Sequence, residues 1–373
     1  MPGDGILRRG RIPPLAAIAA AGTALAIAAA IGAYGLRPAS GQGTEGGDRS
    51  GADTDAAPLV IYTPHPTEIA ETITREFRQK TGIPILLVQE GTGELMSRLV
   101  SGEAPRADVF WGGGVESLEA AADYFEPYVS AADTFIRTEV HSTGHRWNPF
   151  SVLPVVIVYN ETLVPPEHVP EAWADLLDPW FENRIIMADP EKSGSAYTTL
   201  LTMLSVMAEP GEGTFGGWKY VNRLIAQLGP GGIASSSSLV YSSVASGDFF
   251  AGITFENYAL TLQKSGTNLR YRFPKEGTSA VPDGIALARN AQNREEAVAF
   301  IDFALGKDVQ TIMRLRWERR PIRPDADAKG SLPIPKTARY PVAEAARNRE
   351  AILGRWRDSR GLLSPGTPGD SSR

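Results

Sequence analysis

The sequence predicts an open α/β sheet whose strands end in polar, glycine-rich loops at one edge. Three segments carry this prediction, because each is an apolar run followed by small or polar residues: 59–66, 83–94 and 109–114. The stretches between the first two runs and after the second have helical spacing. A β-α-β-α-β order requires right-handed crossovers and a mostly parallel sheet, which binds ligands at the carboxyl ends of its strands. We therefore expect the three loops to converge on one binding site.

The individual elements follow from local patterns. Leu59 to Tyr62 is apolar and predicts a strand, and Ile69, Ile73 and Phe77 form the apolar stripe of a helix over residues 67–80. Gly82 occupies the C-cap position of that helix. The other predicted strands are 83–88, 109–111, 152–159, 184–188, 251–255 and 285–288, and the other predicted helices are 173–177, 196–207, 218–228, 239–245, 294–305, one starting at 95 and one around 342–356.

Size and charge bound the possible functions. The chain has 373 residues, of which 42% are hydrophobic and 21% charged, an ordinary globular composition. The roughly 315 residues after the N-terminal region exceed what one core usually takes, so we expect two lobes. The net charge of −6 argues against a nucleic-acid-binding surface but not against a local site for a small anion. The lack of cysteine excludes disulfides, thiolate metal sites, cysteine nucleophiles and an acylated lipoprotein anchor.

The N-terminal residues have the pattern of a targeting segment. Arg8, Arg9 and Arg11 precede an uncharged, alanine-rich stretch from residue 12 to 36. Residues 1–36 therefore predict a signal sequence or an N-terminal membrane anchor, and both options remain open. Residues 37–57 predict a disordered linker. We expect an exported protein, periplasmic or at the cell surface.

Signatures of catalysis are missing from the sequence. No G-x-S-x-G elbow, G-x-x-x-x-G-K-[ST] loop or H-E-x-x-H helix occurs, and Met96 stands where a dinucleotide fingerprint begun at Gly91 would need its third glycine. We therefore predict neither an enzyme nor a cofactor.

In the first half of the chain, the candidate site residues follow the strands. His65 lies between Pro64 and Pro66, which fix the backbone and so the direction of the imidazole. A ligand contact is favoured, although a neighbouring loop could hold the ring instead. Thr92, between two glycines and just before a helix, suits an anion, or it is a plain helix cap. The glycines at 112–114 allow close backbone approach to a ligand, or serve a hinge or turn.

The second half contributes hydroxyl groups and one acid. Ser193 or Ser195 caps a helix and can also donate to a phosphate. The serines at 235–238 offer four hydroxyls just before the predicted helix at 239–245, or they form a linker. Glu256 ends an apolar strand, where burial without a partner is costly, so it accepts from ligand hydroxyls or an amine, or pairs with an arginine. Of the four arginines at 316, 319, 320 and 323, Arg320 or Arg323 could reach the site, but a solvated basic face is favoured.

An ordered set of short motifs resembles a known family. The motifs are Thr63-Pro64-His65, Gly91-Thr92-Gly93-Glu94, Asp108-Val109-Phe110-Trp111-Gly112-Gly113, Ala188-Asp189-Pro190, Ser193-Gly194-Ser195, Val244-Ala245-Ser246-Gly247-Asp248, Pro282-Asp283-Gly284 and Ala299-Phe300-Ile301-Asp302-Phe303. Over residues 58–330 the chain resembles an extracellular solute-binding protein of an ABC importer, with the type II periplasmic-binding fold. The branch it resembles includes ferric-ion, sugar-phosphate and phosphonate binders.

The resemblance implies two α/β lobes with a ligand cleft between them and closure of the lobes on the ligand. Residues 58–155 and 275–325 would form the first lobe, residues 156–274 the second, and residues 326–373 a C-terminal helical segment with a disordered tail. The ligand-binding residues implied are Thr63, His65, Thr92, Gly93, Trp111, Gly112, Gly113, Ser193, Gly194, Ser195, Ser237, Glu256 and Asn257.

Within this family, the sequence favours a small phosphorylated organic solute, a sugar phosphate or an organophosphonate. The ferric binders have two adjacent tyrosines where this chain has Asn257-Tyr258, so iron, held by His65, Glu94 and Tyr258, is the alternative. A small polycarboxylate, a secreted enzyme on the same scaffold and a tethered sensor domain are weaker options. The partners expected are the anionic solute and a membrane permease, without nucleic acid, and the protein is expected to be a monomer.

Overall fold

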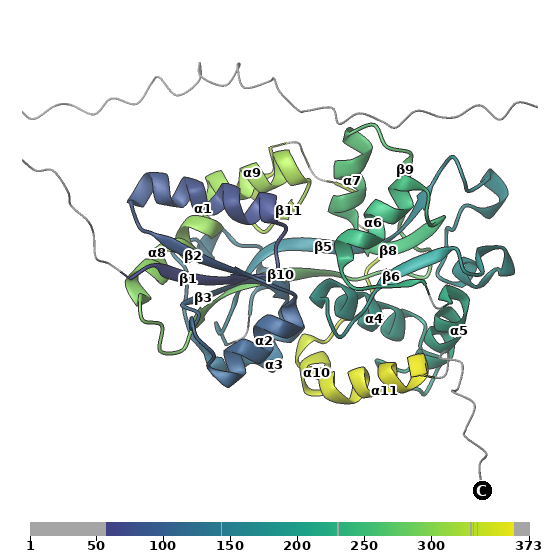
Figure 1. The fold of residues 1–373 in the computed structure, drawn as a ribbon, viewed down its shortest axis with the longest axis horizontal. Coiled ribbons are helices and arrows are strands. Elements are labelled where there is room, and N and C mark those ends of the chain that lie inside the picture. Colours follow the sequence, from purple (N-terminus) through teal and green to yellow (C-terminus); the bar gives the residue numbers. More distant parts are fainter. Residues whose placement is uncertain are drawn as a thin grey trace, which may run out of the picture. The chain divides into compact units, whose positions relative to one another are not determined.

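One mixed sheet runs through the fold, with strand order β2-β1-β3-β10-β5-β8-β6-β7 (Figure 1). The computed structural model describes residues 57–361 except 143, 230, 329, 331 and 334. The strands are β1 (Leu59–Thr63), β2 (Ile85–Gln89), β3 (Val109–Gly114), β4 (Phe125–Glu126), β5 (Asn148–Asn160), β6 (Ile185–Ala188), β7 (Ile233–Ala234), β8 (Ala251–Phe255), β9 (Leu269–Arg272), β10 (Ala280–Ala288) and β11 (Arg320–Pro321).

Helices cover both faces of the sheet (Figure 1). They are α1 (Thr67–Thr81), α2 (Thr92–Ser101), α3 (Val115–Ala120), α4 (Gly194–Val206), α5 (Trp218–Leu228), α6 (Ser237–Ser246), α7 (Glu256–Lys264), α8 (Arg294–Leu305), α9 (Lys307–Trp317), α10 (Val342–Arg347) and α11 (Arg349–Gly361). Short 3-10 turns occur at Ala122–Tyr124, Asp133–Phe135, Thr138–Val140, Pro166–His168, Ala174–Leu177, Pro179–Phe181 and Pro324–Ala326.

The sheet is parallel toward its two ends and antiparallel in its centre. β1 pairs in parallel with β2 and β3, and β6 pairs in parallel with β7 and β8. The long strands β5 and β10 add antiparallel pairing, which the prediction of a mostly parallel sheet did not include. β5 begins four residues before the predicted strand: its first half pairs with β10 and its second half with β8 and β9. One apolar run therefore connects the two halves of the sheet.

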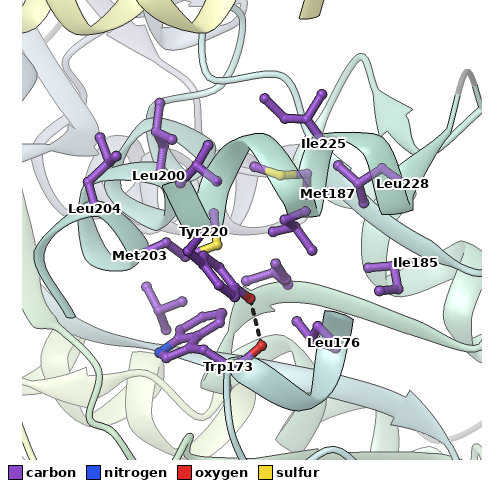
Figure 2. Close-up of a cluster of buried hydrophobic side chains, with 14 of the residues drawn as sticks. Trp173, Leu176, Ile185, Met187, Leu200, Met203, Leu204, Tyr220, Ile225 and Leu228 are labelled. Carbon is purple, nitrogen blue, oxygen red and sulfur yellow. Dashed lines mark hydrogen bonds between the residues drawn. The ribbon is translucent and has the colours of Figure 1, made fainter. Parts of the chain in front are cut away.

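Separate apolar cores lie on the two halves. In the first half, α1, α8 and α9 cover one face of β1 and β3, while Leu95 and Leu118 of α2 and α3 pack on the other. In the second half, α4 and α5 pack on β6 and β8, and the Tyr220 hydroxyl in that core donates to the Trp173 carbonyl at 2.7 Å (Figure 2). Two cores agree with the expectation of two lobes, while the predicted lobe boundaries remain predictions.

The C-terminal segment belongs to both halves. The sequence predicts one helix around 342–356, whereas the structure has α10 and α11, broken at Asn348. α10 packs on α3, and Ile352, Leu353 and Trp356 of α11 enter the second-half core. The C-terminal segment therefore packs against both halves and is part of the folded structure.

Some predictions fall outside the described residues. These are the signal or anchor at 1–36, the linker up to residue 56 and the tail beyond 361. Within the part that is described, no helix has both the length and the apolar character needed to span a bilayer.

Candidate functional site

A cavity of about 550 Å³ lies where the carboxyl ends of β1, β2 and β3 face loops of the second half. The first half lines it with residues 63–67, 89–92 and 113–114, and the second half with residues 192–195 and 235–238. The loops expected to converge therefore do so. The cavity is the size of a small-molecule site.

Three serine hydroxyls form a cluster on the second-half wall. The Oγ of Ser193 lies 2.9 Å from Ser195 Oγ and 2.6 Å from Ser237 Oγ, and Ser195 and Ser237 are also hydrogen-bonded. Ser193 is the N-cap of α4, accepting from the Ala196 N–H at 3.3 Å, as one of the two capping options predicted. Ser237 begins α6, two residues before the predicted helix start, and the run 235–238 lines the cavity, so these serines are not a linker.

Four helices begin at residues that line the cavity. They are α1 at Thr67, α2 at Thr92, α4 at Gly194 and α6 at Ser237. The first N–H groups of a helix lack partners within it, and the helix dipole places partial positive charge there. The wall is therefore suited to an anion that accepts several hydrogen bonds at once.

The two halves touch through glycines beside the cavity. A Cβ on Gly91 would lie 2.5 Å from the Lys192 carbonyl oxygen, and one on Gly93 would lie 2.6 Å from the Glu191 carbonyl oxygen. A Cβ on Gly194 would lie 2.7 Å from the hydroxyl of Thr92. These approaches leave no room for a side chain, so the β2–α2 loop and the β6–α4 loop are in backbone contact, as in a closed cleft.

A buried ion-pair network forms the first-half wall. Arg319 donates to Asp283 at 2.6 Å and to Ser151 at 3.0 Å, and it lies 3.4 Å from His65 Nδ1. Because a guanidinium only donates, His65 Nδ1 is the acceptor and the ring proton is on Nε2. Burial and the charge of Arg319 hold the pKa of His65 well below its usual range, so the imidazole is neutral at pH 7.

Two tyrosines complete the inner wall. Tyr241 of α6 and Tyr258 of α7 stack with ring centroids 4.4 Å apart. Burial raises the pKa of Tyr258, and the neighbouring Arg319 opposes that rise by its charge and a hydrogen bond. Burial also raises the pKa of Tyr241. Both phenols are therefore neutral at pH 7.

Most of the predicted site residues line this cavity. They are Thr63, His65, Thr92, Gly113, Ser193, Gly194, Ser195 and Ser237, together with Glu94 and Tyr258 from the predicted iron set.

Five predicted residues do not line the cavity, and packing explains each. Trp111 is fully buried, its ring edge-on to His65 at 4.7 Å, and Gly112 lies beneath the same imidazole. Gly93 faces the Glu191 carbonyl, and Asn257 is buried behind the wall. Glu256 is fully buried away from the cavity.

Glu256 pairs with an arginine rather than facing the ligand. Arg320 donates to both of its carboxylate oxygens, at 2.7 and 3.0 Å, and the Tyr271 hydroxyl donates at 3.3 Å. Burial, and after it the neighbouring Glu256 carboxylate, raise the pKa of Tyr271 to about 12. Of the alternatives for Glu256, the structural ion pair is the one observed.

The four arginines near residue 320 do not form a solvated basic face. Arg316 alone of the four has a half-exposed side chain, bonded to Glu68, while Arg323 is buried and bonded to Asp325. Neither Arg320 nor Arg323 reaches the cavity, whereas Arg319 does. The four arginines differ in how deeply their side chains are buried, and no pattern in the sequence indicates that difference.

The acidic side chains of the wall already accept hydrogen bonds from other groups of the protein. Glu90 accepts from Arg98 at 2.8 Å, and Glu94 accepts from the backbone N–H of Gly91 at 3.0 Å. Among the described residues, no group of three or more His, Cys, Asp or Glu side chains could hold a metal ion.

Sequence reasoning missed Gln89, Lys192, Tyr241, Asp283 and Arg319 as lining residues. Two signals could have found some of them. Tyr241 lies four residues after Ser237 and so shares its helix face, and Asp283 belongs to a motif already noted for the resemblance.

Comparison with known proteins identifies the family. The model of the bacterial extracellular solute-binding proteins matches residues 106–349, more than half of the chain, so the chain belongs to this family. The predicted resemblance to the solute-binding proteins of ABC importers, with their two-lobed α/β fold, is confirmed. The family is one of transport binding proteins.

Three similar proteins have names that point to different cargo. A periplasmic protein of Salmonella typhimurium named for 2-aminoethylphosphonate binding is 25% identical over 72% of this chain and 77% of its own. Iron uptake protein A1 of Synechocystis is 26% identical over 64% of this chain and 68% of its own. The solved periplasmic protein AfuA of Actinobacillus pleuropneumoniae, with fructose-6-phosphate bound, superposes with a TM-score of 0.74 at 23% identity, covering 82% and 99%.

Proposed function

We propose that this chain is the exported solute-binding component of an ABC importer, and that it captures a small phosphorylated organic solute by closing its cleft. The solute is a sugar phosphate or an organophosphonate, delivered to a membrane permease by a monomeric binding protein. The observation that carries the proposal is the serine cluster of Ser193, Ser195 and Ser237 at the starts of α4 and α6, opposite Thr92 at the start of α2. Hydroxyls and helix N-termini together bind phosphoryl oxygens.

The Salmonella and Actinobacillus relatives support this class of ligand, since their names describe a phosphonate and a sugar phosphate. Glu256 does not help to distinguish the cargo, because its carboxylate is held by Arg320. The phosphoryl group is therefore better supported than the organic part.

A ferric ion is the second candidate, favoured by one observation. Tyr241 and Tyr258 both line the cavity, which supplies two phenols from separate helices. Against it, burial raises the pKa of both phenols, and Glu94 is engaged at the start of α2. Ferric iron prefers the deprotonated, phenolate form of tyrosine, so two phenols with raised pKa values disfavour iron binding at this site.

A thermal-shift screen of the full chain tests both candidates. The panel contains hexose phosphates, glycerol phosphates, phosphoglycerates, 2-aminoethylphosphonate, inorganic phosphate and ferric citrate. A ligand at a hundred times its dissociation constant adds about 2.7 kcal/mol of stability. We expect a selective shift with an organic phosphate or phosphonate. A shift with ferric citrate alone, accompanied by the colour of a tyrosinate–iron complex, would replace the phosphate proposal by the iron one.

A further inference from the structure

Arg319 is a buried cation in the wall of the cavity, and one of its N–H donors has no acceptor. Its side chain is 3% exposed, and Asp283 and Ser151 fix its guanidinium. Its Nε is buried and has no hydrogen-bond partner among the described residues. A buried N–H without an acceptor is rare in native proteins and costly. A ligand in the cavity that Arg319 lines can supply that acceptor.

The other charged groups in the wall do not favour a ligand with many hydrogen-bond donors, such as a sugar or an amine. Each of the three carboxylates that line the cavity, Glu90, Glu94 and Asp283, already accepts hydrogen bonds from the protein. Lys192, at the rim, has no carboxylate within salt-bridge distance among the described residues. The cavity therefore offers spare cationic donors but no spare carboxylate for sugar hydroxyls or an amine.

Arg319 lies within reach of a small ligand whose other end is at the serine cluster. Ser237 and Tyr241 are one helical turn apart on α6, Tyr241 stacks on Tyr258 at 4.4 Å, and Tyr258 neighbours Arg319. Both ends of this chain of contacts line the same cavity of about 550 Å³. A compound of a few carbon atoms with an anionic group at each end fits a cavity of that size.

We propose that Arg319 forms a second subsite that takes a carboxylate from the organic part of the ligand. The inference rests on the proposed phosphoryl site at the serine cluster, and it narrows the ligand to phosphorylated or phosphono carboxylic acids. Arg319 then acts as a specificity-determining residue, held in place by Asp283 and Ser151. Charge-assisted hydrogen bonds between arginine and carboxylate are among the stronger ones in proteins.

Titration calorimetry on the full chain tests the second subsite without any mutation. The probes are 3-phosphoglycerate and glycerol 3-phosphate, which share a phosphate ester and differ in a carboxylate, with fructose 6-phosphate and 2-aminoethylphosphonate alongside. We expect 3-phosphoglycerate to bind about tenfold more tightly than glycerol 3-phosphate, or better. Equal or weaker binding, or preference for the sugar or the amine, overturns the carboxylate subsite alone. If no phosphoryl compound binds, the proposed function fails with it.

A double variant then assigns the preference to Arg319. Arg319→Met combined with Asp283→Asn removes both buried charges, so neither is left unpaired. We expect it to weaken the binding of 3-phosphoglycerate about tenfold more than that of glycerol 3-phosphate, so that the preference is lost. Arg316→Met, at an exposed arginine, is the matched control and should keep the preference. A double variant that still prefers 3-phosphoglycerate overturns the role of Arg319, and circular dichroism verifies that it is folded.

Discussion

The two walls of the cavity are built by different means. The second-half wall consists of neutral hydroxyls at helix starts, and Ser193 and Ser195 are only two residues apart in the chain. The first-half wall is a buried ionic network in which Arg319 meets His65 across 254 residues and Ser151 across 168. Local sequence therefore brings Ser193 and Ser195 together, although Ser237 joins them from 44 residues away, while only the folded chain assembles the ionic wall. The difference also separates their expected roles, general anion binding and discrimination between organic groups.

The largest effect is expected outside both walls, at the ion pair of Glu256 and Arg320. Glu256→Ala leaves Arg320 without its bidentate partner in a largely buried position. Breaking such a pair typically costs about 3–5 kcal/mol, and we expect the lower end because Arg320 keeps some contact with water. Urea unfolding measures the loss, and Glu209→Ala, at an exposed ion pair, is the control.

The same variant sharpens the corrected role of Glu256. If its carboxylate only pairs with Arg320, the ratio of affinities for fructose 6-phosphate and inorganic phosphate stays that of the wild type. A selective loss for the sugar phosphate would return Glu256 to the ligand.

The hydroxyl wall should respond in binding rather than in stability. Ser195→Ala and Thr92→Ala each remove a donor to the proposed phosphoryl group, and each should weaken binding by about 1–3 kcal/mol. Calorimetry with the best ligand of the screen gives the values. Ser242→Ala, at an exposed position of α6, should bind as the wild type does. Unchanged affinity in both cavity variants would end the phosphoryl assignment.

A substitution at the contact between the two walls should have a smaller effect than the changes above, and it should act on closure of the cleft. Gly93→Ala places a Cβ against the Glu191 carbonyl only when the two loops touch. We expect binding about tenfold weaker, close to 1.4 kcal/mol, with little loss of stability in the unliganded protein. Gly231→Ala, where a Cβ meets open space, is the matched control. Equal affinity of the two variants would show that closure does not need this contact.

The ionic wall should make the protein sensitive to acid. Burial and Arg319 lower the pKa of His65 in the folded state, while in the unfolded chain it titrates near 6.5. The stability it contributes is therefore present above that pH and lost as the pH falls below it, by about 1 kcal/mol at pH 5.5. His65→Asn should lessen the fall in melting temperature between pH 7.5 and 5.5. His145→Asn is the control, and an unchanged slope in His65→Asn would contradict the assignment.

The core elements and half of the site could be read from the sequence because their signals are local. Ile69, Ile73 and Phe77 repeat at helical spacing and are buried in α1 as predicted. Elements with weaker patterns were missed, among them α7 and α9 and the short strands β4, β7, β9 and β11. A two-residue strand such as β11 forms only because it pairs with β5, and two residues are too few to show a periodic pattern.

By itself, the sequence determined the α/β class and the convergence of the strand-end loops, because hydrophobic periodicity and turn residues act over short stretches of chain. The ordered set of short motifs indicated the family by resemblance. The tertiary structure decided which polar groups face the cavity. Arg319 and Arg320 are adjacent in sequence, yet one lines the cavity and the other binds Glu256 behind it. Neighbouring residues near a strand point to opposite sides, and which side holds the ligand depends on what the rest of the chain packs there.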